Sequence, residues 1–207
     1  MPLDTWLTFL AASFVLLIIP GPTILLVLSY ALSQGRRVAL STAAGVALGD
    51  LVAMSASLAG LGALVLASAT LFTVLKWVGA VYLVWLGIKL IRSARAGEVA
   101  LPETGIVSPR HTFGHAAAVT ALNPKSIAFF IAFVPQFLDP GAPLLPQFGI
   151  LIASFVSLAA LNALAYALLA DTLRRHLVRP SAIAWLTRAG GATLIGMGVL
   201  TATLRRA

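Results

Sequence analysis

The chain has 207 residues, of which 60% are hydrophobic and only 10% are charged, and its mean hydropathy is +1.01. Soluble domains carry roughly 25% charged residues, so this chain has too few charges to cover a surface in water, and a soluble enzyme is excluded. The chain contains no cysteine, which excludes a disulfide framework, thiol catalysis and a cysteine-ligated metal. The composition therefore predicts an integral membrane protein with almost no soluble mass.

The few charges separate long apolar stretches along the chain. A transmembrane helix needs about 20 apolar residues, and on this measure we expect six such helices. In chain order the predicted spans are 4–30, 39–66, 70–91, 113–138, 146–170 and 184–204. Only Asp4 precedes the first apolar run, whereas a secretory signal needs positive charge there, so we expect this run to be a retained span. The predicted fold class is an all-α membrane protein.

Lysine and arginine collect in alternate connections between the predicted helices. The first, third and fifth connections carry Arg36 and Arg37, then Lys89, Arg92, Arg95 and Arg110, then Arg174, Arg175 and Arg179. Positively charged connections stay in the cytoplasm, so we expect both termini on the opposite, periplasmic side. The same distribution explains the net charge of +8 as a membrane signature, and it removes nucleic acid as a partner.

The chain also shows weak internal repetition. A Thr-Phe pair stands at the same distance before Pro20 and before Pro124. The stretch Gly79–Gly87 matches Gly190–Gly198 at its glycines and at several apolar positions. The first match aligns the first helix with the fourth, and the second match aligns the third helix with the sixth.

These matches predict two three-helix repeats within one membrane domain. The repeats would comprise residues 1–93 and 113–207, joined by a polar cytoplasmic linker at 94–112. Because each repeat crosses the membrane an odd number of times, the second copy must be inverted relative to the first. Inverted repeats with interrupted helices are typical of secondary transporters.

Proline interrupts the first and fourth predicted helices at corresponding places. Pro20-Gly21-Pro22 should open the first helix, and Asn123-Pro124-Lys125 should open the fourth, since proline removes an amide and obstructs the preceding turn. Backbone groups freed within the membrane must be satisfied by protein or by a water-filled cavity. Paired interruptions of this kind point to a binding site near the midplane, and the alternative is a pair of structural kinks.

Two ionisable residues, Asp50 and Lys125, lie far from any predicted helix end. A charge at this depth is costly, so both should face the interior of the bundle, and Gly45 and Gly49 should allow a neighbouring helix to approach Asp50 closely. The pair is either a structural ion pair or a polar site that binds a zwitterion or carries a proton. The predicted site comprises Pro20, Gly21, Pro22, Thr23, Asp50, Asn123, Pro124, Lys125 and Asn162. Of these, Thr23 and Asn162 have the alternative role of a hydrogen bond between helices.

Several of these motifs together resemble the LysE/RhtB family of amino-acid exporters. They are Pro20-Gly21-Pro22, Gly45–Asp50, Gly79–Lys89, Asn123-Pro124-Lys125, Phe129-Phe130 and Pro135-Gln136-Phe137. The resemblance covers essentially the whole chain and is closer to the homoserine, threonine and neutral amino-acid branch than to the lysine exporters. It implies efflux of amino acids or their derivatives across the bacterial inner membrane, coupled to the proton gradient.

Three alternatives to this function stay open. A metal-ion exporter of the same superfamily would want a cluster of metal ligands in the membrane, whereas the histidines His111, His115 and His176 lie in connections or near helix ends, so no metal site is predicted. A passive channel or a non-transporting membrane subunit is the second alternative. An intramembrane enzyme is the third, and only Asp50 and Lys125 would be available to it. No cofactor is expected, and a homodimer is compatible with the sequence but not required by it.

Overall fold

The structure is a computed structural model that describes residues 1–19, 21–34, 36–67, 69–96, 108–139, 141–170 and 180–203. Every regular element in these ranges is a helix, which confirms the predicted all-helical class. The helices are α1 (Leu3–Ile18), α2 (Pro22–Gln34), α3 (Arg36–Ala67), α4 (Ala69–Ala96), α5 (Pro109–Ala121), α6 (Pro124–Ala132), the 3-10 turn η1 (Val134–Phe137), α7 (Leu144–Leu168) and α9 (Pro180–Thr203). Most of the predicted linker lies outside the described residues.

The two predicted interruptions each divide a helix. α1 and α2 meet at an angle of 55°, and α5 meets the following segment, α6 with η1, at 43°. Pro22 begins α2 and Pro124 begins α6. At the first position of a helix the amide hydrogen has no intrahelical partner, so proline costs no hydrogen bond there. The sequence therefore ends one helical segment and starts the next at each of these prolines. Pro20 lies outside the described residues.

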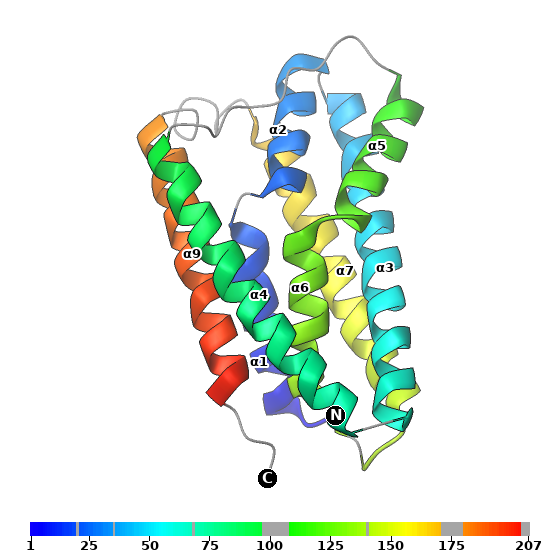
Figure 1. Cartoon of the computed structure of the whole chain (residues 1–207). Helices are drawn as coiled ribbons and strands as arrows, with labels where there is room; N and C mark the ends of the chain where they lie inside the picture. Colours follow the sequence, from blue (N-terminus) through cyan, green and yellow to red (C-terminus); the bar gives the residue numbers. More distant parts are fainter. Residues whose placement is uncertain are drawn as a thin grey trace.

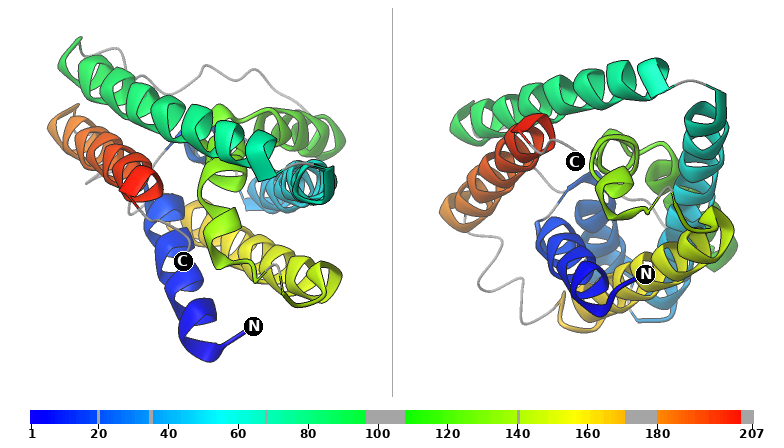
Figure 2. Two further views of the ribbon diagram at one scale, coloured as in Figure 1. Left: turned by 60° about the horizontal axis from the view of Figure 1, so that its bottom comes forward. Right: turned by 90° about the horizontal axis from the view of Figure 1, so that it is seen from below.

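Successive helices run in opposite directions along one bundle axis, with each broken pair counted as one helix (Figure 1). α1 and α2 run in one direction, α3 returns, and α4 runs in the first direction again. The pair α5 and α6 then runs opposite to α1 and α2, α7 opposite to α3, and α9 opposite to α4 (Figures 1 and 2). As a result, α1 begins and α9 ends at the same end of the bundle.

Two of the described helices are long and apolar enough to cross a membrane, over Arg37–Gly62 and Leu144–Leu168. If each bent pair is counted as one span, the number rises to four. These four coincide with the first, second, fourth and fifth spans predicted from the sequence. The third and sixth predicted spans fall on α4 and α9, which are not among the four.

The glycines of α3 bring this helix close to α5, as the sequence predicts. A Cβ atom added at Gly49 would lie 2.6 Å from both the carbonyl oxygen of Ala117 and the Cβ of Thr120. A Cβ at Gly45 would likewise collide with the carbonyl oxygen of Phe113. Such distances are possible only because glycine lacks a side chain, so the backbones of α3 and α5 touch along this line.

We expect Gly49→Val to lower the unfolding temperature of the purified protein in detergent by several degrees. The added side chain would separate α3 from α5, and overpacking of this kind costs typically ~1–3 kcal/mol. Gly60→Val is the matched control in the same helix, because a Cβ at Gly60 meets nothing within 4 Å. Equal unfolding temperatures for the two variants would contradict the packing described here.

The two glycine stretches that match in the sequence also contact each other in space, where α4 crosses α9 (Figure 2). A Cβ added at Gly87 would meet the carbonyl oxygen of Gly191, and one added at Gly191 would meet that of Gly87. A Cβ at Gly198 would lie 2.7 Å from the carbonyl oxygen of Ala80. Gly87, Gly191 and Gly198 therefore allow close packing between α4 and α9, whereas Gly79 packs against Ala132 and Gly190 against Ile19.

Candidate functional site

The two helix breaks lie at the same height in the bundle (Figure 1) and face one small cavity of about 20 Å³. The cavity is lined by residues from α1, α2, α3, α6 and α7 and from the two breaks. Six of the predicted site residues are among them: Gly21, Thr23, Asp50, Asn123, Lys125 and Asn162. Residues from both halves of the chain therefore share one polar cavity inside an apolar bundle.

Lys125 connects the start of α6 to the end of α1. Its side chain is 8% exposed, and its ammonium donates hydrogen bonds to the carbonyl oxygens of Leu16 at 3.1 Å and Ile19 at 2.9 Å. The last carbonyls of a helix have no amide partner within the helix, and the helix dipole makes this end favourable for a cation. Lys125 therefore satisfies two oxygens that the break in the first helix leaves open.

Two side chains of α7 donate hydrogen bonds to the two backbone carbonyl oxygens that lie between Leu16 and Ile19 in the chain. Asn162 donates from Nδ2 to the oxygen of Leu17 at 3.0 Å, and the Tyr166 hydroxyl donates to that of Ile18 at 2.8 Å. The carbonyl oxygens of four consecutive residues, 16 to 19, thus each accept a hydrogen bond from a side chain. Tyr166 was not predicted, although it stands one helical turn after Asn162 and so shares its face of α7.

Asn123 connects the two breaks directly. Its side-chain oxygen accepts a hydrogen bond from the Lys125 amide at 3.0 Å, which caps the N-terminus of α6. Its amide nitrogen donates to the Thr23 hydroxyl in α2 at 3.0 Å. Thr120 donates to the same hydroxyl at 3.4 Å. This buried network fixes the start of α2 against the junction of α5 and α6.

Asp50 faces the same cavity from α3 and is 2% exposed. Its Oδ1 atom has no hydrogen-bond partner among the described residues. Among the described residues no ion pair joins Asp50 to Lys125 either, and the lysine donates to the carbonyl oxygens of Leu16 and Ile19. A buried polar atom without a protein partner is rare in native proteins, and a ligand, a proton, a water molecule or an ion can satisfy it. Asp50 is therefore the group of this cavity most available to a ligand or a proton.

Two prolines of the predicted site do not line the cavity, unlike its polar residues. Pro22 and Pro124 are exposed, and neither lines the cavity. They begin α2 and α6 and so set where the broken segments restart. Pro20 is not among the described residues.

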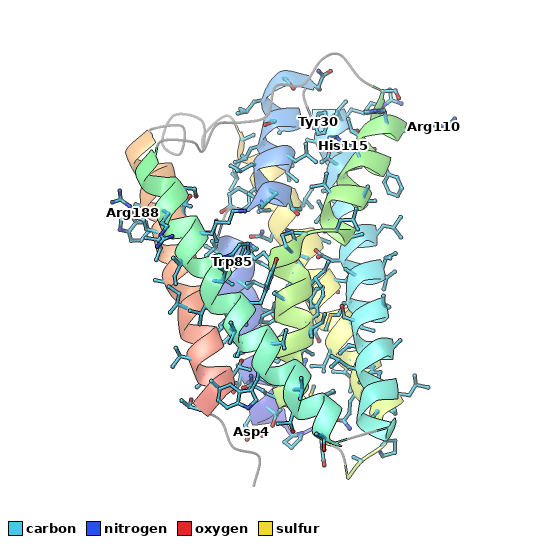
Figure 3. All side chains as sticks on the ribbon, in the orientation of Figure 1. Asp4, Tyr30, Trp85, Arg110, His115 and Arg188 are labelled. Atoms are coloured by element: carbon cyan, nitrogen blue, oxygen red, sulfur yellow. The ribbon has the colours of Figure 1, made fainter. Side chains whose placement is uncertain are left out.

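Aromatic side chains lie on either side of the cavity along the bundle. Towards the end where α1 begins, α6, η1, α7 and α1 contribute a cluster of buried phenylalanines: Phe9, Phe129, Phe130, Phe133, Phe137 and Phe155. Towards the other end, the Tyr30 hydroxyl of α2 lies 2.8 Å from Nδ1 of His115 in α5 (Figure 3). A cavity needs roughly 10–15 Å³ to hold one water molecule, so this one must widen to admit anything larger.

The sequence profile of the LysE type translocator family matches residues 14–205. This chain belongs to that family. Its members are transporters rather than enzymes, which agrees with a polar cavity inside a bundle of apolar helices and confirms the resemblance seen in the sequence.

Three relatives indicate how far the similarity extends. An uncharacterized membrane protein of Vibrio cholerae is 35% identical over 205 residues, which cover 99% of this translocator and 100% of the relative. The homoserine/homoserine lactone efflux protein of Salmonella typhimurium is 33% identical over 208 residues and 100% of both chains. The leucine efflux protein of Klebsiella pneumoniae is 32% identical over 143 residues, 66% of this chain and 65% of the relative. No solved structure matches the translocator.

Proposed function

We propose that this LysE-type translocator exports amino acids or their derivatives as a secondary transporter. The observation that carries this proposal is the cavity between the helix breaks, which brings a buried cation, Lys125, and a buried carboxylate, Asp50, to one site. An amino acid carries both a carboxylate and an ammonium, so its site needs complementary groups for both. The relatives named as homoserine and leucine efflux proteins support this class of substrate.

Each buried charge has a distinct role in this proposal. Lys125 attracts the substrate carboxylate, helped by the N-terminal end of α6. Asp50 attracts the substrate ammonium or takes up a proton while the site faces outward. Thr23, Asn123 and Asn162 hold the two breaks around the substrate through the hydrogen bonds that they make. Gly21 leaves room beside the Lys125 side chain.

Two other functions fit the site less well. A metal-ion exporter would meet the ammonium of Lys125 in the cavity, and this charge repels a metal cation, whereas divalent metals prefer carboxylate, histidine or thiolate ligands. A non-transporting membrane subunit would have no use for an unpartnered carboxylate oxygen inside the bundle.

The proposed architecture is six transmembrane helices in two inverted three-helix repeats, 1–93 and 113–207, with a cytoplasmic linker at 94–112. The opposite directions of α1–α2 and α5–α6, of α3 and α7, and of α4 and α9 support the inversion (Figure 1). In this arrangement α4 and α9 are the third and sixth spans. The rocking of one repeat against the other would open the cavity to each side of the membrane in turn.

The proposed membrane is the bacterial inner membrane, with both termini in the periplasm and with export driven by the entry of protons. Arg110 lies at the end of the bundle opposite to Asp4, which supports a cytoplasmic location for the basic connections (Figure 3). Assembly as a homodimer is compatible with this arrangement.

The function is tested in cells that overexpress the translocator and are fed dipeptides, which they hydrolyse to free amino acids. An exporter lowers the internal concentration of its substrate and raises the external one relative to cells with an empty vector. A panel of dipeptides identifies the substrate. Unchanged concentrations across the whole panel, with the protein present in the membrane, would contradict export and favour a non-transporting subunit.

The topology has its own test in reporter fusions placed after Ala207. We expect a reporter that works only in the periplasm to be active when it is fused after Ala207. Six crossings from a periplasmic N-terminus return the chain to that side. Fusions within the 94–112 linker should show the opposite behaviour. A fusion after Ala207 that is active only in the cytoplasm would contradict the proposed number or direction of crossings.

Gly21→Val is expected to abolish export without loss of protein from the membrane. A Cβ atom at Gly21 would already lie 3.3 Å from Nζ of Lys125, and the valine branches would fill the cavity. Gly114→Val is the matched control, because a Cβ at Gly114 meets nothing within 4 Å. The measurement is efflux from dipeptide-fed cells, corrected for the amount of each variant in the membrane.

A further inference from the structure

The end of α1 presents a group of backbone oxygens that suits an ammonium ion. We call the carbonyl oxygens of Leu16 and Ile19 the α1 oxygen pair. Both accept hydrogen bonds from the single ammonium of Lys125, at 3.1 and 2.9 Å. They stand one turn apart at the C-terminal end of a helix, where the dipole adds partial negative charge. Asp50 contributes its carboxylate to the same cavity.

The carbonyl oxygens at the end of α1 do not require a charged hydrogen-bond donor. The neighbouring oxygens of Leu17 and Ile18 are satisfied by the neutral donors Asn162 and Tyr166. A neutral donor would serve the α1 oxygen pair equally well as a cap and would avoid the cost of burying a charge. The buried ammonium therefore points to a site whose chemistry is selected for a cation.

The space in the cavity requires that some group leave before an amino acid can bind. The cavity of about 20 Å³ holds about one water molecule. Lys125 ends in this cavity on a flexible four-carbon stem, and it lies against Gly21, which has no side chain to hold it in place. Withdrawal of the lysine would free both the volume and the two oxygens.

We propose that the α1 oxygen pair binds the ammonium of the substrate, and that the substrate enters by replacing the Lys125 ammonium there. The displaced lysine then pairs with the substrate carboxylate. The exchange keeps the charge of the cavity constant, because a zwitterion adds no net charge and each ammonium retains a partner. Asp50 stays free to bind the proton. This inference rests on the proposed function and specifies which group holds each end of the substrate.

If the substrate ammonium replaces that of Lys125, analogues that lack one end of the amino acid should bind differently from the amino acid itself. An N-acetylated amino acid has no ammonium, so it cannot displace Lys125 from the oxygen pair. An amino-acid methyl ester has the ammonium but no carboxylate, so it leaves the displaced lysine buried without a partner. Removal of the lysine charge should therefore weaken the binding of the amino acid and strengthen the binding of the ester.

The experiment measures the affinities of purified wild-type protein and Lys125→Gln in detergent for three ligands. The ligands are L-homoserine or L-leucine, whichever the efflux panel identifies, with its methyl ester and its N-acetyl derivative. The glutamine amide can still donate to the α1 oxygen pair, so the helix end stays capped. We expect the ester to bind about tenfold more tightly to Lys125→Gln than to the wild type, and the amino acid to bind more weakly. An unchanged or weaker affinity for the ester would overturn the replacement.

Asp50→Asn provides a second measurement that does not depend on the lysine variant. If the ammonium binds the α1 oxygen pair, this variant still prefers the amino acid over its N-acetyl derivative by about tenfold or more. Loss of that preference would place the ammonium on Asp50 and overturn the proposal. A wild type that binds none of the amino acids of the efflux panel would overturn the proposed function as well, whereas binding without these shifts overturns the replacement alone.

Discussion

Lys125→Ala is expected to reduce amino-acid efflux to the level of cells without the translocator. The change removes the partner of the substrate carboxylate and leaves the carbonyl oxygens of Leu16 and Ile19 without a donor. Leaving a buried acceptor unpaired costs about 1–3 kcal/mol, so the variant should also unfold at a lower temperature than the wild type. Efflux is measured in dipeptide-fed cells and corrected for the amount of protein in the membrane.

The matched control is Lys89→Ala. Lys89 is exposed, and its ammonium lies over the ring of Trp85 at 5.3 Å, away from the cavity. We expect this variant to export at the wild-type rate. Normal export by Lys125→Ala, with the protein inserted, would show that the lysine is structural and that the substrate site lies elsewhere.

Asp50→Asn is expected to abolish proton-driven efflux and to remove its dependence on external pH. In the wild type, external acid should accelerate export, because Asp50 takes up a proton while the cavity faces outward. Asparagine has nearly the same shape as aspartate but cannot bind that proton. The measurement is the initial rate of efflux at a series of external pH values, with the internal pH held constant.

Asp4→Asn is the control for this variant, because Asp4 is an exposed carboxylate at the start of α1. It should keep the pH dependence of the wild type. An unaltered pH dependence in Asp50→Asn would assign the proton to another group. If efflux were restored only by the exchange of charges, Asp50→Lys with Lys125→Asp, the two residues would form a structural ion pair during the cycle and would not contact the substrate.

Much of the cavity could be predicted from the sequence because its causes are local. Proline removes an amide wherever it stands, so Pro22 and Pro124 indicated both helix breaks directly. A charge within an apolar run must face the interior, which placed Asp50 and Lys125 inside the bundle. The glycines before Asp50 likewise predicted the close approach of α3 to another helix.

The partners of Lys125 could not be predicted in the same way. Backbone carbonyls carry no sequence signature, and whether the lysine reaches Asp50 or α1 depends on where α1 ends and how α6 is rotated. Tyr166 shows the same limit: its spacing from Asn162 becomes meaningful only once the end of α1 is known to face α7. The sequence therefore located the charged residues and left their contacts to the tertiary structure.

We propose that the substrate passes through the cavity between the two helix breaks, and transport by purified protein in liposomes tests this route. Liposomes loaded with the labelled amino acid are diluted into acidic buffer, and release of the label is followed over time. We predict rapid release from liposomes that contain the wild type or Gly114→Val, and release at the rate of empty liposomes for Gly21→Val. Equal rates for Gly21→Val and the wild type would contradict passage through the cavity, because the substrate would then cross by another route.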